Sequence, residues 1–139
     1  MFELLYTSIS PKGMSDSDLK DILEKSRLKN QNLGITGMMI YHDREIIQIL
    51  EGEKDIVQAL FQTIFNDSRH SSVDLFYQGE IKNRAFSNWS MAFKLLDEDM
   101  IKTIEDGYEG SNQDASPVFM LKNSRNRGTK TFLSLRDGL

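Results

Sequence analysis

The sequence predicts an α+β domain with one β-sheet and two helices packed on one of its faces. Segments whose apolar side chains recur at every second position indicate strands, and two stretches with the helical period indicate amphipathic helices. Along the chain these elements come in the order strand, helix, strand, strand, helix, strand, followed by one further strand. This βαββαβ order is typical of a ferredoxin-like sheet, whose first and third strands are neighbours at its centre. We expect an extra strand in that sheet and a helical or mixed cap at the C-terminal end.

Two polar side chains interrupt the apolar faces of the predicted central strands. Tyr6 lies on the apolar face of the first strand, residues 2–8, because side chains alternate along a strand. Gln48 lies in the same way on the apolar face of the third strand, residues 45–50. If these strands are neighbours, the phenol and the amide are adjacent on the helix-covered face, near the slit between the two helices.

The two predicted helices supply the walls of that slit. Ser15 is a good N-cap for the first helix, which should end between residues 30 and 34. Asn30 follows four positions after Ser26 and therefore lies on or beside the buried side of this helix. The second helix, residues 53–67, has a continuous apolar side. The inward-facing positions of the two helices are Leu19, Ile22, Leu23 and Ser26, and Ile56, Val57, Leu60, Phe61 and Ile64.

The remaining strands are predicted from alternation and turn residues. Residues 35–41 and 45–50 flank a short turn and indicate a hairpin. Two more strands are expected at about residues 73–78 and 89–95, the second carrying Trp89 and Met91 on one face. After residue 97 the pattern weakens to a short helix near residues 98–107 and turn-rich sequence.

Composition excludes several classes of function. The chain of 139 residues has no cysteine, and its only histidines, His42 and His70, have no metal-ligand spacing around them. A net charge of −4 argues against a nucleic-acid partner, and we expect the late basic residues to form a solvated loop: Lys122, Arg125, Arg127 and Lys130. The N-terminus lacks the pattern of a signal peptide, and no apolar run approaches the roughly 20 residues of a membrane span. We therefore expect a cytoplasmic protein that contacts no membrane.

The pairing of Tyr6 with Gln48 admits two interpretations. Both side chains could be buried merely to satisfy each other, since an unpaired buried polar group costs about 1–3 kcal/mol. Alternatively, the pair could line a ligand cleft, because Asn30 brings a second amide to the same slit. A cleft with apolar walls and a few amides suits a flat heteroaromatic ligand that has its own donors and acceptors.

Five segments, in order and spacing, resemble the BLUF family, the sensors of blue light using flavin. The resemblance extends from about residue 2 to residue 96 and rests on LLYTS with Tyr6, KNQNLGITG with Asn30, QILEG with Gln48, DSRH at 67–70, and RAFSNWSM with Trp89 and Met91. It implies residues 1–97 as a flavin-binding photosensor domain and residues 98–139 as a capping or output segment.

The resemblance also implies a cofactor and its contacts. The cofactor is a noncovalent flavin, normally FAD, with FMN or riboflavin as alternatives. Asn30 and Gln48 would hydrogen-bond its polar edge, and Tyr6 would lie beside Gln48 as the photochemical donor. The further residues assigned to flavin binding are Ile22 and Ile64, which would sandwich the ring, Ser26 and Lys29 from the first helix, and Arg69 and His70, which either cap the second helix or approach the ribityl chain and phosphates.

The same resemblance implies a light-driven signal rather than catalysis. Electron and proton transfer from Tyr6 would rearrange the hydrogen bonds of Gln48, and the change would pass through the Trp89/Met91 strand to an effector protein. The sheet face away from the helices needs a cover, which either the C-terminal segment or a second copy of the chain could provide, and we also expect a homo-oligomer. Ile46 departs from the family, in which many members have an aromatic residue two positions before the glutamine, and this difference concerns tuning rather than flavin binding.

Two other functions fit the predicted fold. A light-independent flavin enzyme could use the same cleft, although no glycine motif for nicotinamide binding occurs. A small hydrolase resembling acylphosphatases would need an arginine in the anion-binding loop after the first strand, where the chain offers only Lys12.

Overall fold

The computed structural model describes residues 1–67, 71–88, 90–95, 98–106, 116 and 120. The chain divides into two units, Met1–Leu95 and Leu96–Leu139. The first unit holds the sheet and two helices. The second unit contains α3, Glu98–Asp106, which confirms the short helix predicted there. Three predictions for the C-terminal end lie outside the described residues. They are the solvated loop with the late basic residues, a strand or part of a cap at residues 118–122 apart from Met120, and a short helix that the sequence predicts at residues 129–137.

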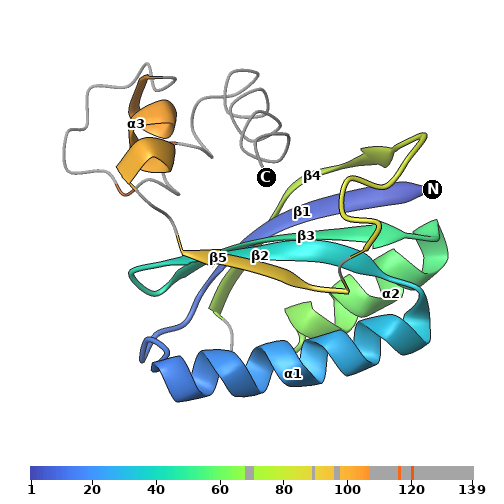
Figure 1. Cartoon of the computed structure of the whole chain (residues 1–139), viewed down its shortest axis with the longest axis horizontal. Coiled ribbons are helices and arrows are strands. Elements are labelled where there is room, and N and C mark those ends of the chain that lie inside the picture. The colour runs from blue at the N-terminus through green and yellow to red at the C-terminus, as the bar shows by residue number, and fades with distance from the viewer. Residues whose placement is uncertain (68–70, 89, 96–97, 107–115, 117–119, 121–139) are drawn as a thin grey trace. The chain divides into compact units, whose positions relative to one another are not determined.

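The first unit is a five-stranded sheet with two helices on one face, as predicted (Figure 1). The strands lie in the order β4-β1-β3-β2-β5, so the first and third strands are central neighbours. All pairs are antiparallel except the parallel pair of β2 with β5. The elements are β1 Phe2–Ile9, α1 Asp16–Leu33, β2 Thr36–His42, β3 Glu45–Gly52, α2 Lys54–Phe65, β4 Ser71–Glu80 and β5 Ala92–Leu95.

Local sequence fixes both ends of α1. The Ser15 side chain accepts a hydrogen bond from the backbone N–H of Asp18, and the Asp18 carboxylate accepts one from the backbone N–H of Ser15, which forms a capping box. At the other end Gly34 adopts a left-handed conformation, with φ 68°, that glycine accepts without strain. The helix therefore starts and stops where the sequence predicts.

The hairpin of β2 and β3 turns through two residues, Asp43 and Arg44, which both have positive φ. Such turns match the twist of the flanking strands. His42 belongs to β2, so the turn is one residue shorter than the sequence indicated. Gly37 in β2 permits a close approach, because a Cβ there would lie 2.1 Å from the backbone oxygen of Ile49.

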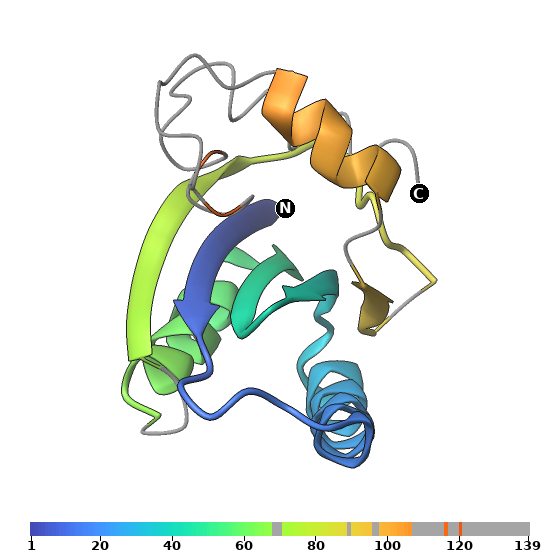
Figure 2. The same cartoon turned by 90° about the vertical axis from the view of Figure 1, so that its left-hand side faces the viewer.

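The space between the helices and the sheet holds an apolar core. Figure 2, which views α1 nearly end-on, shows both helices on the same face of the sheet. Side chains from β1, β3 and α2 dominate this core, and the alternation along β1 places Phe2, Leu4 and Tyr6 in it as predicted. The opposite face of the sheet is also buried, at Leu5, Met38, Ile40, Ile47 and Ile49.

The last strand starts later than the sequence indicated. β5 begins at Ala92, so Met91 precedes the strand instead of alternating along it, and Trp89 lies outside the described residues. In the residues before β5, the backbone carbonyls of Ser90 and Met91 accept hydrogen bonds from side chains of α1.

Candidate functional site

A cavity of about 420 Å³ lies between the two helices and the sheet. Its size falls within the range of roughly 300–1,000 Å³ that small-molecule sites occupy. Strands β1, β2 and β3 form its floor, and α1 and α2 form its two sides. The predicted residues that line it are Tyr6, Ile22, Ser26, Lys29, Asn30, Gln48 and Ile64. The predicted residues Arg69 and His70 lie outside the described residues.

Tyr6 and Gln48 meet on the cavity floor. They face each other in the register of β1 and β3, and the Tyr6 hydroxyl donates a hydrogen bond to Oε1 of Gln48. Both side chains are buried, Tyr6 at 1% exposure and Gln48 at 6%. Burial raises the pKa of the Tyr6 phenol well above its usual value, and the nearby Asp67 carboxylate raises it further. Tyr6 is therefore a neutral phenol that keeps its proton at physiological pH.

Gln48 has a second partner, Met91, which lies on the segment just before β5. Its Nε2 lies 3.5 Å from the sulfur of Met91, which accepts a weak hydrogen bond. Met91 is buried at 2% exposure and packs in the helix-side core. The amide thus links the phenol of β1 to the residue immediately before β5.

Asn30 connects the last turn of α1 to the same segment. Its Nδ2 donates a hydrogen bond of 2.7 Å to the backbone oxygen of Ser90, and the side chain is buried at 2% exposure. This bond uses one of the four hydrogen-bonding positions of the amide, and Asn30 also lines the cavity. The structure therefore brings Asn30 to the site with polar capacity for a ligand.

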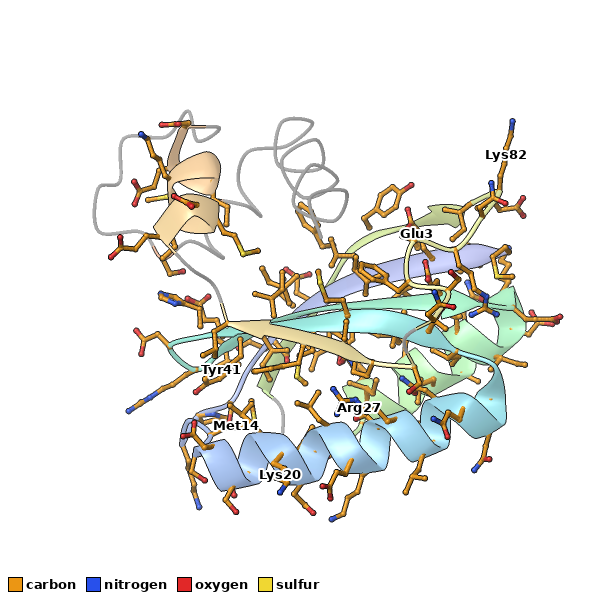
Figure 3. All side chains as sticks on the ribbon, viewed as in Figure 1. Glu3, Met14, Lys20, Arg27, Tyr41 and Lys82 are labelled. Carbon is orange, nitrogen blue, oxygen red and sulfur yellow. The ribbon has the colours of Figure 1, made fainter. Side chains whose placement is uncertain are left out.

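Two residues without a predicted role act at this site or next to it, Asp67 in the cavity lining and Arg27 beside the Met91 segment. Arg27, one turn before Asn30, reaches from α1 toward the sheet (Figure 3), and its Nε donates a hydrogen bond of 3.0 Å to the backbone oxygen of Met91. Asp67 lines the cavity just after α2 and acts on Tyr6 through its charge. The spacing of three between Arg27 and Asn30 places both on one side of a helix and could have identified Arg27.

The apolar walls of the cavity come from both helices and from β3. Ile22 and Ile64 lie on opposite sides, and Ile46 of β3, at the position where the family often has an aromatic residue, is buried and also borders the cavity. On the α2 side, the ring of Phe61 packs against that of Tyr6 with centroids 5.4 Å apart. Flat apolar walls combined with two buried amides and a phenol fit a ring that has polar atoms along one edge.

Neither a metal site nor a membrane span is found in the part of the chain that the structure describes. No group of three or more acidic, histidine or cysteine side chains there could hold a metal ion. None of the helices in those residues combines the length and apolar character that a membrane crossing requires.

Fold and site together define a small ferredoxin-like domain with a ligand cavity between its helices and a phenol–amide pair in that cavity. Residues 1–92 match the family model of sensors of blue-light using FAD, named BLUF. The chain belongs to this family of blue-light sensors.

Similar sequences are found in photoactivated adenylate cyclase subunits. A photoactivated adenylate cyclase subunit beta from Euglena longa is 34% identical over 89 residues, which are 63% of this chain and 10% of the relative's length. The same subunit from Euglena gracilis is 32% identical over 89 residues, again 10% of its length. The chain therefore spans only about a tenth of these relatives.

Solved structures show the same fold. The photo-activated state of BlsA superimposes with a TM-score of 0.82 at 28% identity, covering 96% of this chain and 92% of BlsA. The dark state of BlrB, described as a BLUF protein, gives a TM-score of 0.67 at 27% identity, covering 88% of this chain and 92% of BlrB. These matches confirm the ferredoxin-like fold with helices on one face.

Proposed function

We infer that this chain is a blue-light photoreceptor that binds a flavin noncovalently in the cavity between α1 and α2 and signals to an effector protein. The observation that carries this inference is the buried hydrogen bond from Tyr6 to Gln48 on the cavity floor. FAD is the flavin we propose, since the family description includes it. Ile22 and Ile64 would hold the ring, and Asn30 and Gln48 would hydrogen-bond its polar edge.

Tyr6 is suited to give up an electron and a proton together. A bound flavin, once excited by blue light, supplies a strong oxidant to this site. The raised pKa keeps the phenol protonated, so oxidation of Tyr6 must be accompanied by movement of its proton. The hydrogen bond to Oε1 of Gln48 gives that proton an acceptor already in place.

Gln48 is suited to respond to electron and proton transfer from Tyr6, because its amide has an acceptor oxygen on one side and a donor NH2 group on the other. Its oxygen accepts from Tyr6, and its NH2 group faces the sulfur of Met91. Rotation or tautomerisation of the amide reverses these roles with little movement of the backbone. After rotation the oxygen would face Met91, whose sulfur can accept but not donate a hydrogen bond, so Met91 would have to shift.

The signal would leave through β5. Met91 is followed at once by this four-residue strand, which pairs with β2, and the strand ends at the boundary of the second unit. We propose that residues 98–139 cap the domain or contact the effector, and that the chain forms a homo-oligomer. Trp89 retains its predicted role in signal transmission within this proposal.

The test is a difference spectrum of the purified protein before and after blue illumination. The expected result is a yellow protein whose flavin absorption shifts to longer wavelength and returns in darkness. Tyr6→Phe should bind flavin but lose the shift completely, because the variant keeps the ring and removes the transferable proton. Ser17→Ala, an exposed change at the start of α1, is the matched control and should retain the full shift.

Two results would contradict the proposal. A normal reversible shift in Tyr6→Phe would remove Tyr6 from the photochemistry. A protein that binds flavin, shows no light-induced shift and oxidises a substrate with bleaching of its colour would favour the light-independent enzyme instead.

A further inference from the structure

A buried carboxylate on the sheet face opposite the cavity binds the segment that leads to Met91. Glu51 of β3 has no exposed surface, and its side chain points to the face of the sheet away from the helices, because it alternates with Leu50. Its Oε2 accepts from the backbone N–H of Ala85 at 2.9 Å, and its Oε1 accepts from that of Phe86 at 2.7 Å. The Thr36 hydroxyl donates a third hydrogen bond to Oε1, at 2.8 Å.

Arg84, the residue before Ala85 and Phe86, also binds Thr36 and Glu51. Its guanidinium donates to the Thr36 hydroxyl at 2.8 Å and to the backbone oxygen of Glu51 at 3.2 Å. It also donates to the backbone oxygen of Gly34, the C-cap of α1, at 2.7 Å. Arg84 therefore joins the end of α1, the sheet and the segment 84–91.

These contacts close a loop of hydrogen bonds around the end of α1. Arg84 binds Gly34, and four residues earlier in the helix the Asn30 side chain binds Ser90 at the other end of the segment. Arg27 adds a bond to the backbone oxygen of Met91. Both ends of the segment 84–91 are therefore held by hydrogen bonds. Asn30, which binds this segment, lines the cavity, and Met91, which belongs to it, contacts Gln48.

We propose that Glu51 and Arg84 are positioning residues for the photoreceptor, which hold the segment 84–91 so that Asn30 and Met91 stand in the geometry that favours the dark arrangement of Gln48. This proposal rests on the function proposed above. The two residues touch neither Tyr6 nor Gln48 through their side-chain hydrogen bonds; they act through the segment. Loosening them lets a light-like arrangement of Gln48 become populated in darkness, because the bias toward one arrangement is weaker.

The chemistry of Glu51 gives a sharp variant. All three partners of the Glu51 carboxylate are hydrogen-bond donors. Glutamate accepts hydrogen bonds on both of its terminal oxygens, whereas glutamine, which has the same shape, accepts on only one terminal atom. Glu51→Gln keeps the volume, but its NH2 group must face at least one donor and leaves it without an acceptor. The segment then loses an anchor without the creation of a cavity.

The experiment measures two quantities in the flavin-bound protein. The first is hydrogen exchange of the backbone amides of Ala85 and Phe86, by mass spectrometry of peptides that cover them. The second is the amplitude of the light-minus-dark difference spectrum per bound flavin. In Glu51→Gln the two amides should exchange at least tenfold faster and the amplitude should fall at least twofold, with the dark spectrum displaced toward the illuminated one.

Two further variants make the result specific. Arg84→Lys keeps the charge but replaces a fork that reaches three acceptors with one ammonium group, and should reduce the amplitude less than Glu51→Gln. Glu3→Gln is the matched control, because Glu3 pairs with Glu51 across β1 and β3 and is also buried. In Figure 3, Glu3 lies on the side of the sheet opposite Arg27. Glu3→Gln should leave the amplitude unchanged.

The outcomes separate the two proposals. If the unmodified protein shows no light-induced shift, the proposed function fails, whereas amide exchange still reports on the anchor. If Glu51→Gln accelerates exchange at Ala85 and Phe86 but keeps the full amplitude, or if Glu3→Gln lowers the amplitude equally, the positioning role is wrong. Should Glu51→Gln fail to fold or to bind flavin, an unchanged amplitude in Arg84→Lys overturns the proposal and a reduced one supports it.

Discussion

The two helices that enclose the cavity are held in different ways. α2 has no side-chain N-cap, and it packs an apolar side against β1 and β3 through Val57, Leu60 and Phe61. α1 is longer, 18 residues against 12, and its buried residues are the two leucines Leu19 and Leu23 and the amide Asn30. Its ends are fixed instead by a capping box, a left-handed glycine and hydrogen bonds to the segment 84–91.

This difference shows how one cavity can have a rigid wall, formed by α2, and a wall that can rearrange, formed by α1. The wall formed by α2 is set by apolar packing, which tolerates little displacement because protein interiors are close-packed. The wall formed by α1 is set by directional hydrogen bonds, which can be exchanged at small cost when a partner moves. Tyr6 packs against Phe61 of the rigid α2 wall, whereas Asn30 belongs to the α1 wall and Met91 to the segment that this wall binds.

The largest effect on stability is expected from the packed wall. Leu60→Ala, at 7% exposure in α2, should lower the free energy of unfolding by about 2–4 kcal/mol, because it removes buried apolar surface and leaves a cavity. Leu28→Ala, the same change at 66% exposure in α1, should alter it by less than about 0.5 kcal/mol. Urea unfolding at one fixed flavin concentration measures both, and similar losses would refute the contrast.

Flavin binding should stabilise α1 more than α2. At a flavin concentration of 100 times the dissociation constant, linkage adds about 2.7 kcal/mol, or about 100-fold in protection, to structure that opens only when the ligand leaves. We expect slowing of that order for amides along α1 and less than about tenfold for α2. Hydrogen exchange in darkness at limiting and saturating flavin tests this, and equal slowing in both helices would mean that they open together.

The capping box should contribute a smaller, local amount. Ser15→Ala removes the side-chain acceptor for the N–H of Asp18 and should cost about 1 kcal/mol. Ser17→Ala, two residues further along the exposed first turn, should change stability little or raise it slightly, because alanine is the better helix former. Thermal unfolding compares the two variants, and equal effects would show that the cap is dispensable.

The smallest effect is expected from pH near neutrality. Because burial raises the pKa of Tyr6, the folded protein retains this proton at pH values where an unfolded tyrosine, with a pKa near 10, loses it. The contribution to stability is complete below about pH 10 and is lost as pH rises above that value. The light-induced shift should therefore keep its amplitude between pH 6 and 9, and a titration midpoint within that window would contradict a buried neutral phenol.

Much of the site could be predicted from local sequence. Alternation places Tyr6 and Gln48 on one face, and the order of elements makes their strands neighbours, so the pair follows from patterns that span a few residues each. Helical spacing likewise places Ile22 and Asn30 toward the cavity. The bounds of α1 follow from its caps, since Ser15 and Gly34 carry their own local reasons to start and stop a helix.

The segment between β4 and β5 could not be predicted in the same way. A strand was expected from residue 89, but the carbonyls of Ser90 and Met91 bind Asn30 and Arg27, which lie about 60 positions earlier. No local pattern distinguishes a carbonyl that will meet a strand from one that will meet a side chain. For the same reason alternation could not decide whether Trp89 or Met91 meets Gln48.

By itself the sequence determined the elements, their buried faces and the phenol–amide pair, because periodicity and caps are properties of neighbouring residues. Tertiary structure alone decided that Met91 meets Gln48 and that Glu51 and Arg84 hold the segment leading to it. Such contacts join parts of the chain that become neighbours only after the sheet has assembled, and they depend on distances that no local pattern encodes.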